Sequence, residues 1–103
     1  MIGRQAIKAT KPGSILVNTA RGELVDQPAL TMALKSGHLA AAGIDVFGSE
    51  PVHPDDPLLM LDNVVLAPHL AWLTVETLDR SLAVVKENCR RLAASQELLH
   101  RVC

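Results

Sequence analysis

The stretch Ser14-Ile15-Leu16-Val17-Asn18-Thr19-Ala20-Arg21-Gly22 decides the fold. Its apolar run predicts a buried strand over Ser14 to Asn18, and Asp26-Gln27-Pro28 then predicts the start of a helix. Arg21 therefore falls in a strand-to-helix loop, where open parallel sheets bind ligands. A guanidinium there can hold a carboxylate through two parallel hydrogen bonds. The alternative is structural: Arg21 pairs with an acid such as Asp26 or covers apolar surface with its stem.

The remaining segments alternate between helix and strand patterns. Expected elements are a helix over Ile2 to Thr10, a helix capped by Asp26 with Leu30, Ala33 and Leu34 on its apolar face and Gly37 as its stop, strands over Ala40 to Phe47 and Asn63 to Ala67, and a helix from Thr74 toward Ala94. The unalternated apolar run Ala40 to Phe47 is typical of a strand that is covered on both faces. This order predicts an α/β fold: a partial Rossmann-type parallel sheet of about three strands, flanked by helices on its faces.

The last of these helices is long and amphipathic. Its apolar side chains are spaced alternately by three and four residues, at Val75, Leu78, Leu82, Val85, Cys89 and Leu92. We expect this stripe to be buried against another surface, because a helix with one apolar face is stabilised by packing.

Composition limits the classes of function. The chain has 103 residues, 49% hydrophobic and 20% charged, which favours one folded domain over disorder. A net charge of −1 and an aromatic content of 2% argue against a nucleic-acid partner. No apolar run is long enough to cross a membrane and no signal peptide is evident, so we expect a cytoplasmic protein without a membrane partner. Cys89 and Cys103 show neither metal-ligand nor disulfide spacing, and both are interpreted as ordinary thiols.

Three residues with complementary chemistry follow the ends of the expected strands. Arg21 follows the first strand, Glu50 the second, and His69 comes directly after Ala67-Pro68. The carboxyl ends of parallel strands share one edge, so a guanidinium, a carboxylate and an imidazole can converge there on one small molecule. An imidazole transfers protons near neutral pH, and a carboxylate bonded to its other nitrogen orients the ring. Singly, Glu50 is also explained as a solvated loop acid and His69 as a helix-entry residue.

These motifs resemble the D-isomer-specific 2-hydroxyacid dehydrogenases over nearly the whole chain. The resemblance rests on three ordered segments: Lys11-Pro12-Gly13 through Leu24-Val25-Asp26, Gly43-Ile44-Asp45-Val46-Phe47 with Glu50-Pro51, and Asp62-Asn63-Val64 with Pro68-His69-Leu70-Ala71. It implies that Arg21 binds the substrate carboxylate and carbonyl, that His69 is the acid/base, and that Glu50 hydrogen-bonds His69. Trp72 is similar to glycerate dehydrogenase and hydroxypyruvate reductase members.

The same resemblance implies NAD or NADP as cofactor and a small 2-hydroxy or 2-oxo acid as substrate. The expected cofactor contacts are Thr19, Ala20, Arg21, Asp45, His69, Ala71 and Trp72. The family's substrate domain and glycine-rich turn have no counterpart in the sequence, which contains no G-x-G pair. Residues 1–103 are thus expected to be the carboxyl-terminal half of a dinucleotide-binding domain plus the terminal helix, a fragment inactive alone.

Two competing functions and one assembly follow from these expectations. The chain is either part of an oxidoreductase that transfers hydride to C2 of a 2-oxo acid, or a non-catalytic remnant that only oligomerises or binds ligand weakly. A third hypothesis is a metal site at His53-Pro54-Asp55-Asp56, although proline-broken loop acids are usually solvated; no metal ligand is assigned.

An open Ser14 to Asn18 edge and the terminal apolar stripe both predict a homodimer or higher oligomer.

Overall fold

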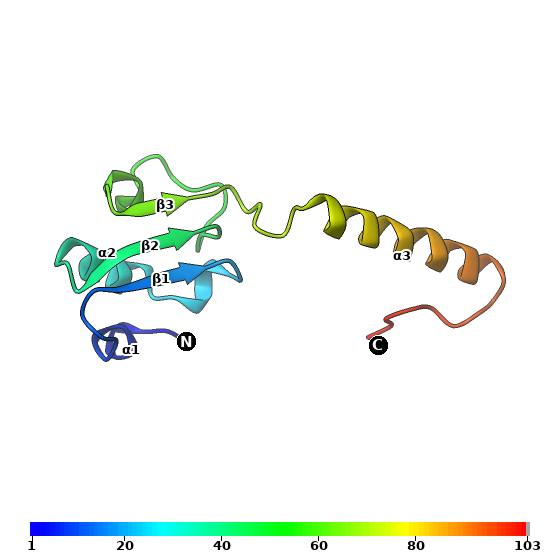
Figure 1. Ribbon diagram of the computed structural model, residues 1–103, viewed down its shortest axis with the longest axis horizontal. Helices are drawn as coiled ribbons and strands as arrows, with labels where there is room; N and C mark the ends of the chain where they lie inside the picture. The colour runs from blue at the N-terminus through cyan, green and yellow to red at the C-terminus, as the bar shows by residue number, and fades with distance from the viewer. Residues whose placement is uncertain (103) are drawn as a thin grey trace. The chain divides into compact units, whose positions relative to one another are not determined.

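The computed structural model describes residues 1–102, which form two compact units, residues 1–71 and the segment from Trp72 onward. The first unit contains a three-stranded parallel sheet in the order β1-β2-β3 (Figure 1). Its strands are β1 (Ser14–Asn18), β2 (Leu39–Ile44) and β3 (Val64–Leu66). The register pairs Leu16 with Ala42 across β1 and β2. The predicted α/β class and parallel sheet are confirmed.

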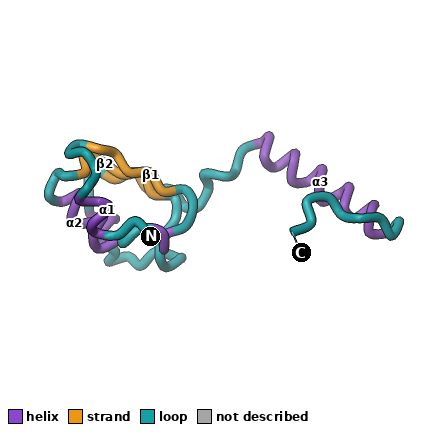
Figure 2. The backbone as a smooth tube through the Cα atoms, turned by 90° about the horizontal axis from the view of Figure 1, so that it is seen from below, coloured by secondary structure: helices purple, strands orange, loops and turns teal. Residues whose placement is uncertain are grey.

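The first two helices pack on the same side of this sheet (Figure 2). Helix α1 spans Arg4–Lys8 and α2 spans Gln27–Lys35. The Asp26 side chain caps α2 by accepting a hydrogen bond of 3.0 Å from the Ala29 amide, as the sequence predicts. Leu30 and Leu34 of α2 are 2% and 3% exposed, and burying each such side chain contributes about 1.5 to 3 kcal/mol.

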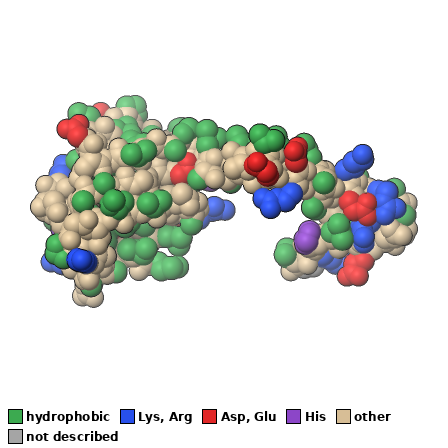
Figure 3. Space-filling model, in the orientation of Figure 1, with side chains coloured by type: hydrophobic (Ala, Val, Ile, Leu, Met, Phe, Trp, Pro, Cys, Tyr) green, Lys and Arg blue, Asp and Glu red, His purple; other side chains and the backbone are tan. Residues whose placement is uncertain are grey.

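The expectation that helices cover both faces of the sheet is wrong for residues 1–71. Side chains on the face opposite α1 and α2 are exposed: Ile15 and Val17 at 68% and Val65 at 75%. Figure 3 shows hydrophobic side chains distributed over this face. The small residues of β2 are compatible with a covering layer on each side, but local sequence cannot specify whether that layer is present. One face of the sheet is therefore a large apolar surface.

Several element boundaries differ from the sequence predictions. The first helix begins at Arg4 instead of Ile2, because Ile2 forms a parallel bridge with Val25. Strand β2 ends at Ile44 instead of Phe47, since the Asp45 carbonyl accepts a bond from the His69 amide and the chain leaves the ladder. The proline-rich loop contains the short 3-10 helix η2 (Pro57–Met60), which buries Leu58. A second short helix, η1 (Gly22–Leu24), follows β1.

The second unit is dominated by helix α3 (Val75–Ala93). The Thr74 hydroxyl caps it by accepting a bond of 3.1 Å from the Thr77 amide, as expected. No side chain of α3 is buried, so the apolar stripe expected to be covered is exposed. None of the helices within residues 1–102 has the length and apolar composition needed to cross a bilayer. Cys89 is an exposed free thiol, whereas Cys103 lies outside the described residues.

Candidate active site

The three chemically complementary residues line one cavity of about 400 Å³ at the carboxyl ends of the strands. Arg21 enters it from the loop after β1, Glu50 from the loop after β2, and His69 from the segment after β3. The volume lies within the roughly 300 to 1,000 Å³ typical of small-molecule sites. The expected convergence of these residues is thus present in the structure, whereas their roles stay predictions.

His69 and Glu50 form the central pair of the cavity. The distance from His69 Nδ1 to Glu50 Oε2 is 2.9 Å, and both side chains are 41% exposed. The second oxygen, Glu50 Oε1, accepts a bond of 3.0 Å from the Phe47 amide. These two hydrogen bonds, that from His69 first, lower the pKa of Glu50 below its ordinary value. An ionised carboxylate accepts hydrogen bonds and cannot donate them, so His69 Nδ1 carries the hydrogen. Nε2 is then the ring atom that can exchange a proton with a ligand.

A buried carboxylate holds the segment that presents His69. Asp45 is 4% exposed, and its two oxygens accept bonds of 2.8 and 2.9 Å from the amides of Leu70 and Ala71. His69 itself has a φ of 58°, in the left-handed region that a non-glycine residue rarely adopts. Such backbone conformations persist where surrounding contacts over-determine them. Asp45 therefore fixes the direction from which the imidazole enters the cavity.

The loop that carries Arg21 is fixed by Asn18 and Gly22. Asn18 is 8% exposed, accepts a bond from the Ala20 amide at 3.1 Å and donates one to the Arg21 carbonyl at 2.8 Å. Gly22 packs so closely on the next loop that a Cβ would lie only 2.0 Å from the carbonyl carbon of Phe47. The roles of Gly22 and Asp45 were not predicted, because each depends on contacts between distant segments. The role of Asn18 was not predicted either, although its two hydrogen bonds are local. The only local signal was the presence of Asn18 at the strand end.

The Arg21 side chain does not pair with Asp26, which caps α2 instead. Its Nη1 donates to the Ala20 carbonyl at 2.7 Å, and the guanidinium remains at the wall of the cavity with Glu50 and His69. This arrangement leaves a cation facing a space that a substrate carboxylate can enter. The structural alternative of an Arg21–Asp26 ion pair is therefore wrong.

The expected cofactor residues do not all line the same cavity. Thr19, Asp45 and Ala71 line a second, largely apolar cavity of about 310 Å³ above Gly43, on the uncovered face of the sheet. A Cβ at Gly43 would project toward the Val17 methyls, 3.7 Å away, so the missing side chain keeps this space open. An apolar cavity with polar groups at its rim fits a nicotinamide ring. Ala20 does not line this cavity, and Trp72 belongs to the second unit.

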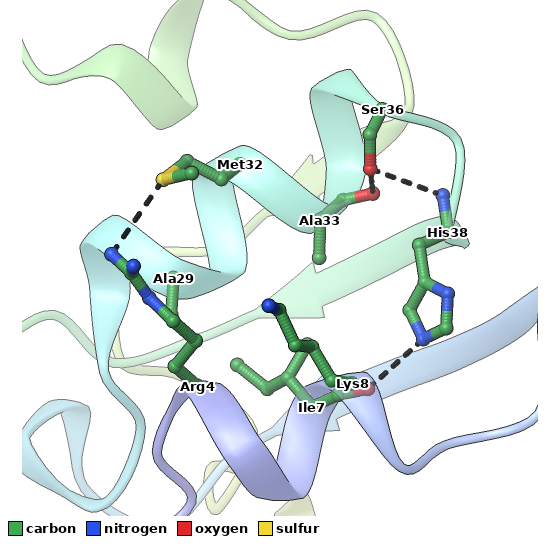
Figure 4. Close-up of a pocket in the computed structure, with 8 residues that line it drawn as sticks. All are labelled: Arg4, Ile7, Lys8, Ala29, Met32, Ala33, Ser36 and His38. Carbon is green, nitrogen blue, oxygen red and sulfur yellow. Dashed lines mark hydrogen bonds between the residues drawn. The ribbon is translucent and has the colours of Figure 1, made fainter.

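Another cavity lies between α1 and α2, away from the strand ends (Figure 4). Arg4 and Lys8 extend across it from α1, and Met32 faces them from α2. It contains none of the predicted site residues. The His53 loop holds no metal site: Asp56 caps η2 and accepts from Gln27, and no group of three ligand residues among residues 1–102 is arranged for a metal ion.

Comparison with known proteins gives the family. Residues 1–71 match the profile of the D-isomer specific 2-hydroxyacid dehydrogenase NAD binding domain. A glyoxylate reductase of Korarchaeum cryptofilum is 56% identical over 88 residues, covering 85% of this chain and 26% of the relative. A glyoxylate/hydroxypyruvate reductase B of Pectobacterium atrosepticum is 46% identical, covering 86% of this chain and 32% of the relative. The chain thus spans about a quarter to a third of these relatives' lengths.

Solved structures give the same result. D-lactate dehydrogenase with NAD+ from Lactobacillus jensenii superposes with a TM-score of 0.88 at 30% identity, covering 100% of this chain and 35% of that one. A D-isomer specific 2-hydroxyacid dehydrogenase from Xanthobacter autotrophicus in complex with NADPH has a TM-score of 0.80 at 37% identity, covering 97% and 40%. The predicted Rossmann-type fold is confirmed. This chain belongs to the D-isomer specific 2-hydroxyacid dehydrogenase family, and its residues 1–71 match that family's NAD-binding domain.

Proposed function

We propose that this chain supplies the catalytic edge of an NAD(P)-dependent 2-hydroxyacid dehydrogenase. The observation that carries the proposal is the 2.9 Å pair between His69 and Glu50 on a cavity that Arg21 also lines. The guanidinium can bind the carboxylate of a 2-oxo acid. The imidazole, oriented by the carboxylate of Glu50, can then donate a proton to the neighbouring carbonyl group of that substrate.

Each of the three residues has a distinct role. Arg21 binds the substrate carboxylate and directs the 2-oxo group toward the imidazole. His69 donates the proton from Nε2 to the carbonyl oxygen as the alcohol forms, and takes it back in the reverse direction. Glu50 stabilises the positively charged ring through Nδ1 and prevents it from rotating. A bound nicotinamide supplies or accepts the hydride at C2.

We propose that the nicotinamide part of the cofactor contacts Thr19, Ala20, Arg21, Asp45, His69, Ala71 and Trp72. Support comes from the apolar cavity bordered by Thr19, Asp45 and Ala71. The diphosphate needs a cradle of backbone amides at a helix start, and no G-x-G-x-x-G turn occurs in these 103 residues. We interpret residues 1–103 as the carboxyl-terminal half of a dinucleotide domain. This half contributes the catalytic residues but little of the affinity for the cofactor.

Glyoxylate and hydroxypyruvate are the substrates that we propose. Two relatives named above carry these compounds in their names, and the position of Trp72 after Ala71 agrees with the glycerate dehydrogenase and hydroxypyruvate reductase members. Both compounds are small 2-oxo acids whose carboxylate matches Arg21. We propose the cytoplasm as the compartment, since neither cysteine has a partner pattern typical of oxidising environments.

A chimera tests this function. In it, the aligned segment of the Korarchaeum glyoxylate reductase is replaced by the corresponding residues of this chain. We expect the chimera to reduce glyoxylate with NADH or NADPH, and the isolated 103-residue chain to show no turnover at high protein concentration. A folded chimera without turnover would contradict the catalytic role and favour the remnant, an oligomerising or weak ligand-binding module.

The isolated chain supplies the complementary test. If it turns substrate over by itself and His69→Ala abolishes that activity, the three-residue constellation is sufficient and the expectation of inactivity is wrong. We also propose that the chain self-associates as a homodimer or higher oligomer, through the β1 edge or the exposed stripe of α3. Both surfaces expose groups that another copy can cover.

A further inference from the structure

Glu50 is carried by a loop, residues 48–56, that lies between β2 and η2 and is called the Glu50 loop below. Its carboxylate reaches His69 from this loop, and the side chain is 41% exposed. Inside the loop, the Asp56 amide donates a hydrogen bond of 2.9 Å to the His53 carbonyl and closes a turn. No helix or strand includes residues 48–56, so the place of Glu50 in the cavity depends on what holds the two ends of its loop.

One side chain of α2 reaches both ends of the Glu50 loop. Gln27 is the first residue of that helix, and its Nε2 donates a hydrogen bond of 2.6 Å to Asp56 Oδ2 at the far end of the loop. At the near end, the Gln27 Oε1 atom lies 3.9 Å from the place that a Cβ on Gly48 would occupy. Gln27 and Asp56 are both half-buried. Gln27 therefore spans the loop on either side of Glu50.

The carboxylate that receives this bond is itself anchored to the core. Asp56 Oδ1 accepts a hydrogen bond of 2.9 Å from the Leu58 amide in η2, and Leu58 is 1% exposed. The two oxygens of Asp56 thus join the loop to the core through η2 and to α2 through Gln27. A hydrogen bond to a charged acceptor is roughly twice as strong as one between neutral groups. The Gln27–Asp56 contact is therefore suited to fixing the far end of the loop.

We propose that Gln27 is a positioning residue for the reaction: through Asp56 it holds the Glu50 loop where the carboxylate meets His69. Gln27 does not line the cavity at the strand ends, so it acts on the imidazole only through the loop. The segment that carries Arg21 leads into the same end of α2, so one helix start supports both the guanidinium side and the carboxylate side of the cavity. The inference rests on the proposed function, in which Glu50 orients His69.

The first test measures the tautomer of the His69 ring in the full chain. Gln27→Glu replaces the donor by a carboxylate that repels Asp56, while an acidic side chain in the first turn is compatible with α2. Long-range proton–nitrogen NMR at about pH 8, above the usual histidine pKa, shows which ring nitrogen carries the hydrogen. We expect Nδ1 in the wild type and a shift toward Nε2 in Gln27→Glu. Gln5→Glu, the same change at an exposed position of α1, is the control and should match the wild type. Wild-type His69 signals in folded Gln27→Glu overturn the proposal.

A second substitution restores the contact with its polarity reversed. When Asp56→Asn is added to Gln27→Glu, the asparagine amide donates to the introduced glutamate, and the asparagine oxygen still caps the Leu58 amide. We expect this double variant to recover the wild-type tautomer of His69. Recovery of stability in urea without recovery of the tautomer would make the contact purely structural and overturn the proposal. If Gln27→Glu does not fold, Gln27→Met removes the donor without adding a charge, and the same two outcomes decide.

The activity of the chimera tests the consequence for the reaction. Gln27→Glu should lower kcat for glyoxylate reduction about 10- to 100-fold, as expected for a catalytic group displaced by a fraction of an ångström to one ångström. Adding Asp56→Asn should bring kcat back to within about threefold of the parent. An unchanged kcat in Gln27→Glu, with an active parent, overturns the positioning role. A parental chimera without turnover contradicts the proposed function instead, because the His69 tautomer decides the role of Gln27 without any substrate.

Discussion

Gly22→Ala is expected to destabilise the sheet unit strongly, because the added methyl clashes with backbone atoms 2.0 to 2.4 Å away. The overlapped atoms are the Phe47 carbonyl and the Gly48 amide nitrogen, which cannot rotate away as a side chain can. Overpacking usually costs about 1 to 3 kcal/mol, so we expect about 3 kcal/mol here. That corresponds to a roughly hundredfold smaller folding constant. The two loops that carry Arg21 and Glu50 are also forced apart.

Gly48→Ala is the matched control. A Cβ at Gly48 meets only the Gln27 Oε1 atom, at 3.9 Å, which is ordinary van der Waals contact. We expect this variant to equal the wild type or to be slightly more stable, since alanine restricts the unfolded chain. Urea unfolding monitored by the amide NMR signals of β2 measures both. The Gly22→Ala midpoint should fall by about 1 to 3 M urea. Equal midpoints for the two variants would refute the described contact between the loops.

Three further outcomes are expected. Asp45→Asn removes one of the two carboxylate oxygens that accept hydrogen bonds from the amides of Leu70 and Ala71. We expect the free energy of unfolding to fall by about 1.5 to 3 kcal/mol and hydrogen exchange of these two amides to accelerate. Unchanged exchange would contradict the anchoring role of Asp45. Glu87 should titrate in carboxyl NMR at about 2 instead of 4.5, because Arg90 and Arg91 bond to it. Since its folded pKa is the lower one, the stability it adds to α3 is complete above the unfolded value and is lost as the pH falls toward 2, and Glu87→Gln should remove this dependence. In the chimera, Arg21→Lys should lower kcat/KM about 10- to 100-fold, as expected for losing a charged bidentate hydrogen bond; unchanged kinetics would exclude Arg21 from the site.

Sequence patterns were sufficient where local chemistry decides the structure. The apolar run before Asn18 gave β1 with its observed limits, and the caps Asp26 and Thr74 gave the starts of α2 and α3. The convergence of Arg21, Glu50 and His69 followed from a general property of parallel sheets, whose carboxyl ends share one edge. These predictions needed no knowledge of distant contacts.

Predictions failed where long-range contacts decide the structure. The end of β2 depends on Asp45, which turns out of the ladder to hold a segment 25 residues later. The need for glycine at position 22 arises only because another loop passes over it. The local sequence also could not predict how many faces of the sheet are covered, because a run of small residues such as Ala40 to Gly43 suits a strand with one or two covered faces.

The kcat of the chimera with His69→Ala measures the central claim most directly. If the imidazole held by Glu50 is the acid/base, its removal should lower kcat for glyoxylate reduction by about two to four orders of magnitude, the range for loss of a general acid/base. His53→Ala is the control and should leave kcat within about threefold, because it makes the same substitution at an exposed histidine that lines neither cavity at the strand ends. A His69→Ala chimera that folds and retains the parental kcat would contradict the account.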